Sequence, residues 1–374
     1  MDLRVRGDFP VTSELTYLDT AYDGPYPLPV LRAAEDFLDK RSRGVGGRVR
    51  DWLEVKDQVR STIADLVGAK PSEVAVTRST TEGTNIVATS LSLGPGDNVV
   101  WDDLGYPSNS VVWLNQERLR GVENRVVQSK EGRASVSDFE RVVDSRTRVI
   151  SISSVSHRNG HVHDVKGLAE LAHARGAYLH VDAIQAVGAI GVDVKRAEVD
   201  FLTCGTYKWL LGPLGLGFLY VREALLPALQ PVFGGDLQVK TWTDVSDLRP
   251  EKFYEDARKF ERATMHYQGV YELRAALAYI NRIGMDEIEE QVLRLSSRVW
   301  TGMDDLGLEL ITPQGTRSGI VACVVSDAQR TAELLADHRI VGSVRAGNEL
   351  RVSPHFFNTE REIDHLLSVL ELLA

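Results

Sequence analysis

The sequence CGTYKWLLGPLGLG, residues 204–217, places one lysine, Lys208, between an apolar strand-like run and a glycine-rich turn. A lysine packed in such surroundings is partly desolvated, which lowers the pKa of its amine and favours the neutral, nucleophilic form. Because most lysines lie on the surface in solvent, only the surrounding sequence can identify Lys208 as a nucleophile.

Outward from this segment, short β-branched apolar runs alternate with helix-length segments between roughly residues 70 and 235. This alternation predicts an α/β fold with a largely parallel sheet and helices on both of its faces. The expected strands are residues 73–77, 98–101, 148–153, 177–181, 200–203 and 217–221.

The chain of 374 residues is longer than one domain usually is, so we expect two domains of unequal size. Beyond about residue 250 long helical stretches lead to two expected strands, 319–325 and 349–352, and to a closing helix over 359–373. The expected division is an N-terminal arm over 1–30 that joins the smaller domain, a large domain over 31–250, and interface helices with the small domain over 251–374.

The composition excludes several classes of protein. A net charge of −10 argues against sequence-independent binding to nucleic acid, whose phosphates require an excess of basic residues. No apolar run approaches the ~20 residues that span a bilayer, so we expect no membrane association. The two cysteines lie far apart in the sequence and form no disulfide framework, which favours a cytoplasmic location.

Two further polar segments lie near expected strand ends. Residues 77–85, TRSTTEGTN, open a helix, where hydroxyls and free backbone N–H groups bind a phosphate. Asp182, in HVDAIQA, follows a buried strand where α/β sheets bind ligands, and a buried carboxylate needs a partner such as a protonated pyridine nitrogen. Each segment taken alone also suits an ordinary helix N-cap.

In their order and spacing, these three segments resemble the class V aminotransferase branch of the fold-type I enzymes that depend on pyridoxal 5′-phosphate (PLP). The resemblance extends from Tyr17, Leu18 and Asp19 to the RVSP sequence that begins at Arg351, and on into the closing helix. It implies a large domain with a mostly parallel seven-stranded sheet plus a smaller α+β domain. The branch includes cysteine desulfurases, selenocysteine lyases, kynureninase, isopenicillin N epimerase-like proteins and cystine C–S lyases.

The resemblance also implies a role for each matching residue. Lys208 is expected to form the Schiff base with the cofactor and to move the proton at the substrate's Cα. Asp182 is expected to pair with the pyridinium nitrogen, and Gln185 to hydrogen-bond the phenolic oxygen. The other implied contacts are Thr80, Thr81 and Tyr207 to the phosphate, Thr264 to the phosphate across a homodimer interface, Tyr106 to the ring face, and His157 or Asn159 near the phenolic oxygen. Arg351 and His157 are the expected substrate-binding residues, with Arg351 on the substrate carboxylate.

Several positions depart from the family pattern. Gly205 and Thr206 stand where desulfurases usually carry a serine, and Thr264 is followed by Met-His rather than Pro-Asn. Residues 344–351 contain no cysteine, although desulfurases carry a nucleophilic cysteine on a loop before the carboxylate-binding arginine. Cys204 and Cys323 both lie in apolar runs, so the sequence disfavours desulfurase chemistry.

A histidine pair and a basic segment are two further candidate binding features. His161 and His163 alternate along GHVHD, but two ligands without a third make a weak metal signal, so we expect no metal. The basic segment 41–50, RSRGVGGRVR, is expected to line the partner subunit's pocket, with Arg48 and Arg50 as candidate contacts to an anionic substrate.

The reaction itself stays open, because PLP assists deprotonation, decarboxylation and β-elimination at the same carbon. We expect chemistry at Cα or Cβ of an amino acid, foremost β-elimination at the C–S bond of an S-substituted cysteine. An aminotransferase and a decarboxylation-dependent deamination to an aldehyde are alternatives. A non-catalytic scaffold is a further alternative, against which the presence of Asp182, Gln185 and Lys208 argues.

Overall fold

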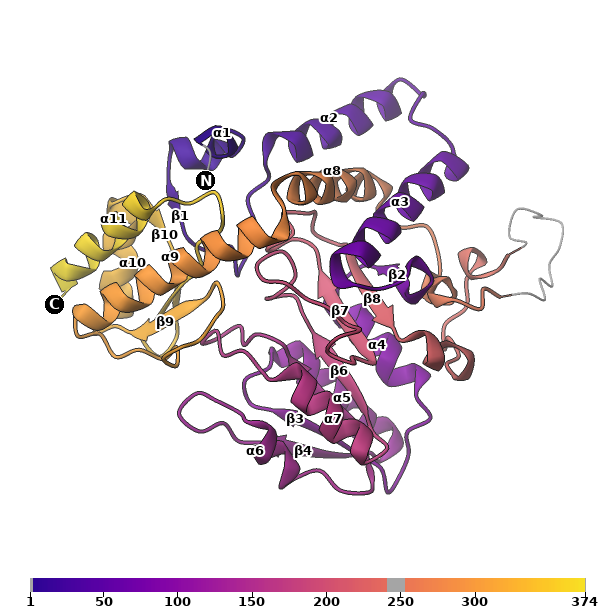
Figure 1. The fold of residues 1–374 in the computed structure, drawn as a ribbon. Helices are drawn as coiled ribbons and strands as arrows, with labels where there is room; N and C mark the ends of the chain where they lie inside the picture. Colours follow the sequence, from indigo (N-terminus) through magenta and orange to yellow (C-terminus); the bar gives the residue numbers. More distant parts are fainter. Residues whose placement is uncertain (1–2, 241–252, 374) are drawn as a thin grey trace.

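The computed structural model describes residues 3–240 and 253–373. Its largest element is a seven-stranded sheet of strand order β2-β8-β7-β6-β5-β3-β4 (Figure 1). The strands from β7 to β4 are parallel, whereas β8 is antiparallel to both of its neighbours. The predicted α/β fold with a mostly parallel seven-stranded sheet is thereby confirmed. The strands are β2 (Val74–Thr77), β3 (Asn98–Asp102), β4 (Glu123–Val127), β5 (Thr147–Ser153), β6 (Tyr178–Asp182), β7 (Phe201–Gly205) and β8 (Gly217–Val221).

Helices cover both faces of this sheet. Alternate residues of β2 point to opposite faces, as the pleat requires. Val74 and Val76 belong to the apolar cluster that also holds residues of α3 and α7, whereas Ala75 belongs to the cluster that holds residues of α4 and α5. Strands covered on both faces become continuous apolar runs, which is why they are readable in the sequence. The helices up to this point are α1 (Leu3–Arg6), α2 (Leu28–Ser42), α3 (Val49–Val67), α4 (Thr80–Ser90), α5 (Pro107–Arg120), α6 (Val136–Glu140) and α7 (Val165–Ala174).

The C-terminal part builds a second, three-stranded antiparallel sheet of order β11-β12-β9. These strands are β9 (Val321–Val324), β11 (Ser343–Arg345) and β12 (Glu349–Val352). The helices of this half are α8 (Tyr267–Ile283), α9 (Met285–Asp305), α10 (Ala328–Asp337) and α11 (Glu360–Leu370). The expected boundary near residue 250 lies outside the described residues, and the division into domains stays a prediction. No helix among residues 3–240 and 253–373 is long and apolar enough to cross a bilayer.

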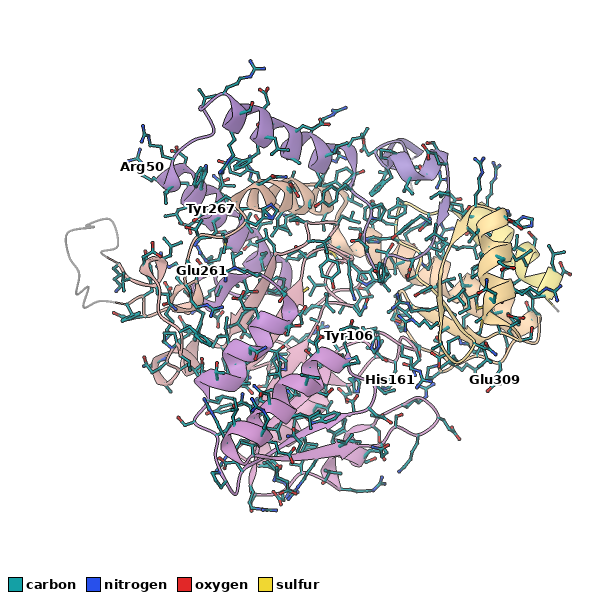
Figure 2. The ribbon with its side chains drawn as sticks, turned by 180° about the vertical axis from the view of Figure 1, so that it is seen from behind. Arg50, Tyr106, His161, Glu261, Tyr267 and Glu309 are labelled. Atoms are coloured by element: carbon teal, nitrogen blue, oxygen red, sulfur yellow. The ribbon has the colours of Figure 1, made fainter. Side chains whose placement is uncertain are left out.

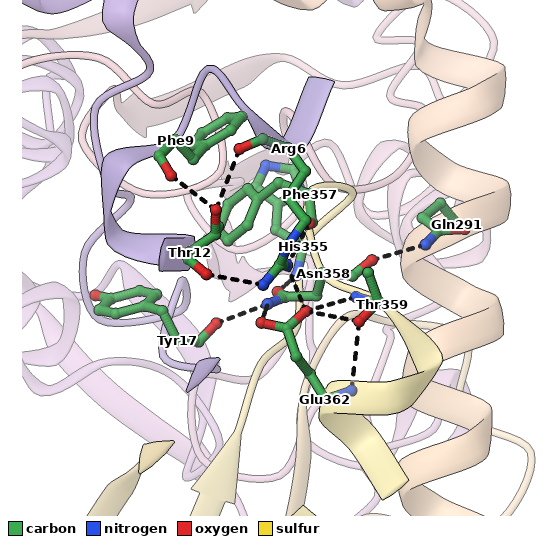
Figure 3. Close-up of polar contacts among 10 residues, drawn as sticks. All are labelled: Arg6, Phe9, Thr12, Tyr17, Gln291, His355, Phe357, Asn358, Thr359 and Glu362. Carbon is green, nitrogen blue, oxygen red and sulfur yellow. Dashed lines mark hydrogen bonds and ion pairs between the residues drawn. The ribbon is translucent and has the colours of Figure 1, made fainter. Parts of the chain in front are cut away.

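The N-terminal segment is fastened to the C-terminal part of the chain. Its strand β1 (Thr16–Tyr17) pairs in parallel with β10 (Ile340–Val341). A polar cluster at the start of α11 holds the same segment (Figure 3). In it, Arg6 forms a 2.6 Å ion pair with Glu362, and Asn358 donates to the Tyr17 carbonyl at 3.0 Å. Asp19, two residues beyond β1, is thereby placed beside Ser353 at the end of β12.

Candidate active site

A cavity of about 430 Å³ lies at the carboxyl ends of the central strands, the edge where parallel α/β sheets bind ligands. Of the site residues expected from the sequence, all except Thr264, Arg48, Arg50 and Asn159 contribute to its lining, and Asn159 instead donates to the Gly132 carbonyl at 2.8 Å. The expected residues that line the cavity are Thr80, Thr81, Tyr106, His157, Asp182, Gln185, Tyr207, Lys208 and Arg351.

Lys208 follows β7 in a tight turn and is only 8% exposed. The turn closes through hydrogen bonds from Leu211 N to the Lys208 carbonyl at 3.0 Å and from Gly212 N to the Thr206 carbonyl at 2.9 Å. Burial, followed by the like charge of Arg351, lowers the pKa of Lys208 to about 8. The amine therefore has the desolvated surroundings expected of a nucleophile or a base.

Asp182 ends β6 and is 3% exposed. Its Oδ2 accepts a hydrogen bond from Asn109 Nδ2 at 2.6 Å, and its Oδ1 accepts one from Ile184 N at 3.0 Å. Burial raises the pKa of Asp182, while these two donors and the nearby Lys208 act in the opposite direction. Asn109 is a site residue that we did not predict, because its only sequence signal is a polar residue in the first turn of α5.

The segment expected to bind phosphate forms the start of α4. Ser79 is the N-cap residue, and its hydroxyl accepts from Glu82 N at 3.1 Å. Thr80 and Thr81 are the first two residues of the helix, with Thr80 Oγ1 buried and without a hydrogen-bond partner in the described part of the chain. A Cβ at position 205 would lie 3.3 Å from that oxygen, so Gly205 leaves space beside it.

Two aromatic side chains and an imidazole surround the cavity above Lys208. The Lys208 amine lies 5.9 Å from the ring centre of Tyr106 and 5.7 Å from that of Tyr207. Tyr106 packs edge-to-face on His157, with ring centres 5.0 Å apart. Burial lowers the pKa of His157 to about 3 and raises that of Tyr207 to about 12. At neutral pH the imidazole is uncharged and the Tyr207 hydroxyl keeps its proton to donate.

Arg351 lies on β12 and is 2% exposed. Its Nη2 pairs with Asp19 Oδ1 at 3.0 Å, and its Nη1 donates to the His157 carbonyl at 2.9 Å. Arg345 on β11 lines the same cavity, and its hydrogen bonds, to Ser343 and the His157 carbonyl, are both 3.4 Å long. Burial and the neighbouring Arg345 lower the pKa of Arg351 to about 10. Two guanidinium groups therefore face one side of the cavity.

The residues expected to act across a dimer interface do not line this cavity. Thr264 is exposed, and its carbonyl accepts from Arg78 Nη2 at 3.3 Å. Arg48 is the N-cap residue of α3 and Arg50 lies in its first turn, and Figure 2 shows Arg50 far from the central Tyr106. Within one chain these positions and the cavity stay separate.

The remaining candidates lie in buried surroundings. His163 Nε2 lies 3.1 Å from Asp102 Oδ2, and the ring of His161 packs edge-to-face on that of His163. No group of three metal-ligating side chains occurs among residues 3–240 and 253–373. Cys204 and Cys323 are fully buried in β7 and β9, and burial raises the pKa of both thiols, to about 12 for Cys323. Both thiols therefore stay protonated at neutral pH.

Comparison with known proteins adds independent findings. The family model described as Aminotransferase class-V matches residues 16–366. An uncharacterized aminotransferase, YcbU, of Bacillus subtilis is 31% identical over 96% of this chain and 94% of its own length. A probable cysteine desulfurase of Methanothermobacter thermautotrophicus is 32% identical over 99% of this chain and 97% of its own.

Solved structures resemble the whole chain. The apo structure of a cysteine desulfurase from Thermococcus onnurineus NA1 has a TM-score of 0.89 at 29% identity and covers 99% of this chain and 97% of its own. The cystine C–S lyase C-DES, solved with cysteine persulfide, has a TM-score of 0.92 over 98% of this chain and 100% of its own. At 22% identity the second likeness concerns the fold alone.

Proposed function

The chain belongs to the class V aminotransferase family of PLP-dependent enzymes, and on that premise we propose that it cleaves the C–S bond of an S-substituted cysteine by β-elimination. The observation that carries this proposal is the cavity lining, which combines the desolvated Lys208 with two arginines. Both cysteines of the chain are buried in strands, and neither belongs to that lining. A lyase needs only a base and room for a leaving group, whereas a desulfurase needs a reactive thiol.

The residues present fit PLP. The buried Thr80 hydroxyl without a partner and the space left by Gly205 suit a phosphate at the start of α4. Thr81 and the protonated Tyr207 hydroxyl would add donors there. Asp182 would hold the ring nitrogen in its protonated form, and Gln185 would donate to the phenolic oxygen. When bound, the cofactor supplies an electron sink for the carbanion at Cα.

The protein's own groups perform the remaining tasks. Lys208 in its neutral form accepts the proton from Cα, and the released electron pair expels the sulfur substituent from Cβ as a thiolate. Arg351 holds the α-carboxylate with a planar fork, which orients the Cα–H bond toward Lys208. His157 is uncharged because of its burial, so it adds no further positive charge beside the two arginines. Addition of water then gives pyruvate and ammonium.

This function is tested by incubating the PLP-loaded enzyme with cystine, other S-substituted cysteines and a panel of ordinary amino acids. Mass spectrometry should show pyruvate and the released thiol or persulfide only with the S-substituted substrates. Stoichiometric keto acid with the amino group retained on the cofactor would favour the aminotransferase, which the likeness to YcbU supports. An aldehyde with release of carbon dioxide would favour decarboxylation-dependent deamination.

The proposed functional unit is a homodimer with composite sites. Neither Thr264 nor the segment 41–50 lines the cavity of its own chain, as expected of residues that act on a partner. At the cavity, the apolar Tyr22 and Leu214 are 69% and 64% exposed, and a partner subunit would cover them. Mixed dimers of Lys208→Ala and Thr264→Ala chains test this, because one of their two sites would carry neither substitution. Recovery of activity on mixing supports composite sites, and its absence with mixed dimers present contradicts them. The cytoplasmic location stays a prediction.

A further inference from the structure

The side-chain amide of Gln185 is held at both of its ends inside the protein. Its Oε1 accepts a hydrogen bond from Trp209 Nε1 at 2.8 Å, and its Nε2 donates one to the Ala21 carbonyl at 3.0 Å. Gln185 is 2% exposed and Trp209 is fully buried, so water does not compete for either bond. Gln185 also lines the cavity, which gives its amide one face toward the protein and one toward a ligand.

These two partners permit only one orientation of the amide. An indole N–H can only donate, and a backbone carbonyl can only accept. If the amide were rotated by 180°, its NH₂ group would face the Trp209 N–H and its oxygen would face the Ala21 oxygen. Both hydrogen bonds would be lost in a buried place, where an unpaired polar group is most unfavourable. Trp209, together with the Ala21 carbonyl, therefore determines on which side of Gln185 the N–H groups lie.

The amide has two N–H bonds, and Ala21 accepts only one of them. Within the described residues the second has no acceptor, although Gln185 is almost fully buried. We propose that Trp209 is a positioning residue, whose indole N–H fixes Gln185 so that this second N–H is offered to the phenolic oxygen of PLP. The inference rests on the proposed assignment of Gln185 to that oxygen.

The surroundings of Trp209 are built to hold its indole in place. A Cβ at position 319 would lie 2.4 Å from the indole Cη2, so Gly319 makes room for the six-membered ring. His355 Nε2 lies 3.0 Å from the Trp209 carbonyl, and because burial lowers the pKa of His355 to about 3, the neutral ring donates through Nε2. On the other side of Gln185, Ala21 N donates to Ser353 Oγ at 2.9 Å. Both partners of Gln185 are thus held by residues that follow Arg351 in the sequence.

The variant Trp209→Phe removes the N–H and keeps an aromatic ring. A hydrogen-bond donor to the phenolic oxygen withdraws electron density from this oxygen. The oxygen then attracts the proton on the nitrogen that joins Lys208 to the cofactor less strongly, and this proton is lost at a lower pH. Loss of the donor should therefore raise the pKa of that proton. We expect the visible absorption band of the PLP-loaded variant to titrate about half to one pH unit higher than that of the wild type.

Gln185→Leu and a double variant separate the possible outcomes. Gln185→Leu should raise the midpoint at least as much, and adding Trp209→Phe to it should produce no further shift, because the two residues act in series. The matched control is Trp300, whose indole N–H donates to the Thr312 carbonyl at 3.0 Å in the C-terminal half. The variant Trp300→Phe should leave the midpoint unchanged. If Trp209→Phe does not fold, benzothienylalanine at position 209 keeps the bicyclic shape without the N–H.

Three results would overturn the inference. An unshifted Trp209→Phe beside a shifted Gln185→Leu would show that Trp209 does not orient the amide. Equal shifts from Trp209→Phe with and without Gln185 would show that it acts by another route. An unshifted Gln185→Leu would refute the assignment of Gln185 itself, and would leave the proposed C–S cleavage to be judged by its products alone.

Discussion

The buried amine of Lys208 should react with an aldehyde at pH values where an ordinary lysine does not. Its pKa is lowered from 10.5 to about 8, first because burial disfavours the ammonium form and second because Arg351 carries a like charge. At pH 7 an amine with that pKa is neutral in about one molecule in ten, against about one in 3000 for an unperturbed lysine. The nucleophilic fraction of Lys208 is therefore about 300-fold larger.

The assay measures how fast the cofactor-free protein reacts with pyridoxal over a range of pH, with borohydride trapping and peptide mass spectrometry to locate the adduct. Modification of Lys208 should rise with pH and level off above a midpoint near 8. Arg351→Gln should raise that midpoint, since a like charge is removed. Arg118→Gln is the control, because that exposed side chain on α5 hydrogen-bonds only Asn115 among the described residues. A wild-type midpoint near 10.5, or a lower midpoint in Arg351→Gln, would refute the reasoning.

Three further predictions concern the same cavity. Arg351→Lys should weaken amino-acid binding ~30- to 1000-fold in a substrate titration, since lysine keeps the charge without the planar fork. The spectrum of the bound cofactor before substrate is added should not change. Alanine at Cys204 or Cys323 should leave turnover within roughly an order of magnitude, because only packing is lost; a persulfide trapped on either thiol, with a far larger loss, would restore the desulfurase interpretation. Asn109→Ala should weaken PLP binding about 5- to 100-fold in equilibrium dialysis, because Asp182 Oδ2 loses its donor; unchanged affinity would show that Ile184 N suffices.

The sequence reveals the central strands and the edge strand β2 well, but the other edge strand, β4, poorly. Strands β5, β7 and β8 are buried on both faces and therefore appear as apolar runs. The edge strand β4 reads ENRVV, and only its last residue is buried. At β4, unlike at the buried edge strand β2, charged side chains discourage pairing with another chain and make the apolar signal weak. We did not predict it, although the family resemblance implied seven strands.

The site residues likewise differ in whether the local sequence can reveal them. Lys208, Asp182 and the start of α4 stand at strand ends, where a short motif carries both the fold and the chemistry. The contact between Arg351 and Asp19 joins residues 332 positions apart, and no local pattern announces it. The bond from Asn109 to Asp182 likewise depends on how α5 packs beside β6. Residues that act through other residues therefore become visible only in the folded chain.

The pairing of Arg351 with Asp19 also bears on what the cavity accepts. A buried guanidinium without a counter-charge is strongly unfavourable, so Asp19 stabilises Arg351 when no substrate is present. Asp19 neutralises one of the two arginines, and Arg345, with hydrogen bonds no shorter than 3.4 Å, is left as the surplus positive charge on that side. One carboxylate from a ligand would balance it. The charges on this side of the cavity therefore match the single α-carboxylate of an amino acid, whichever bond at Cα or Cβ the enzyme breaks.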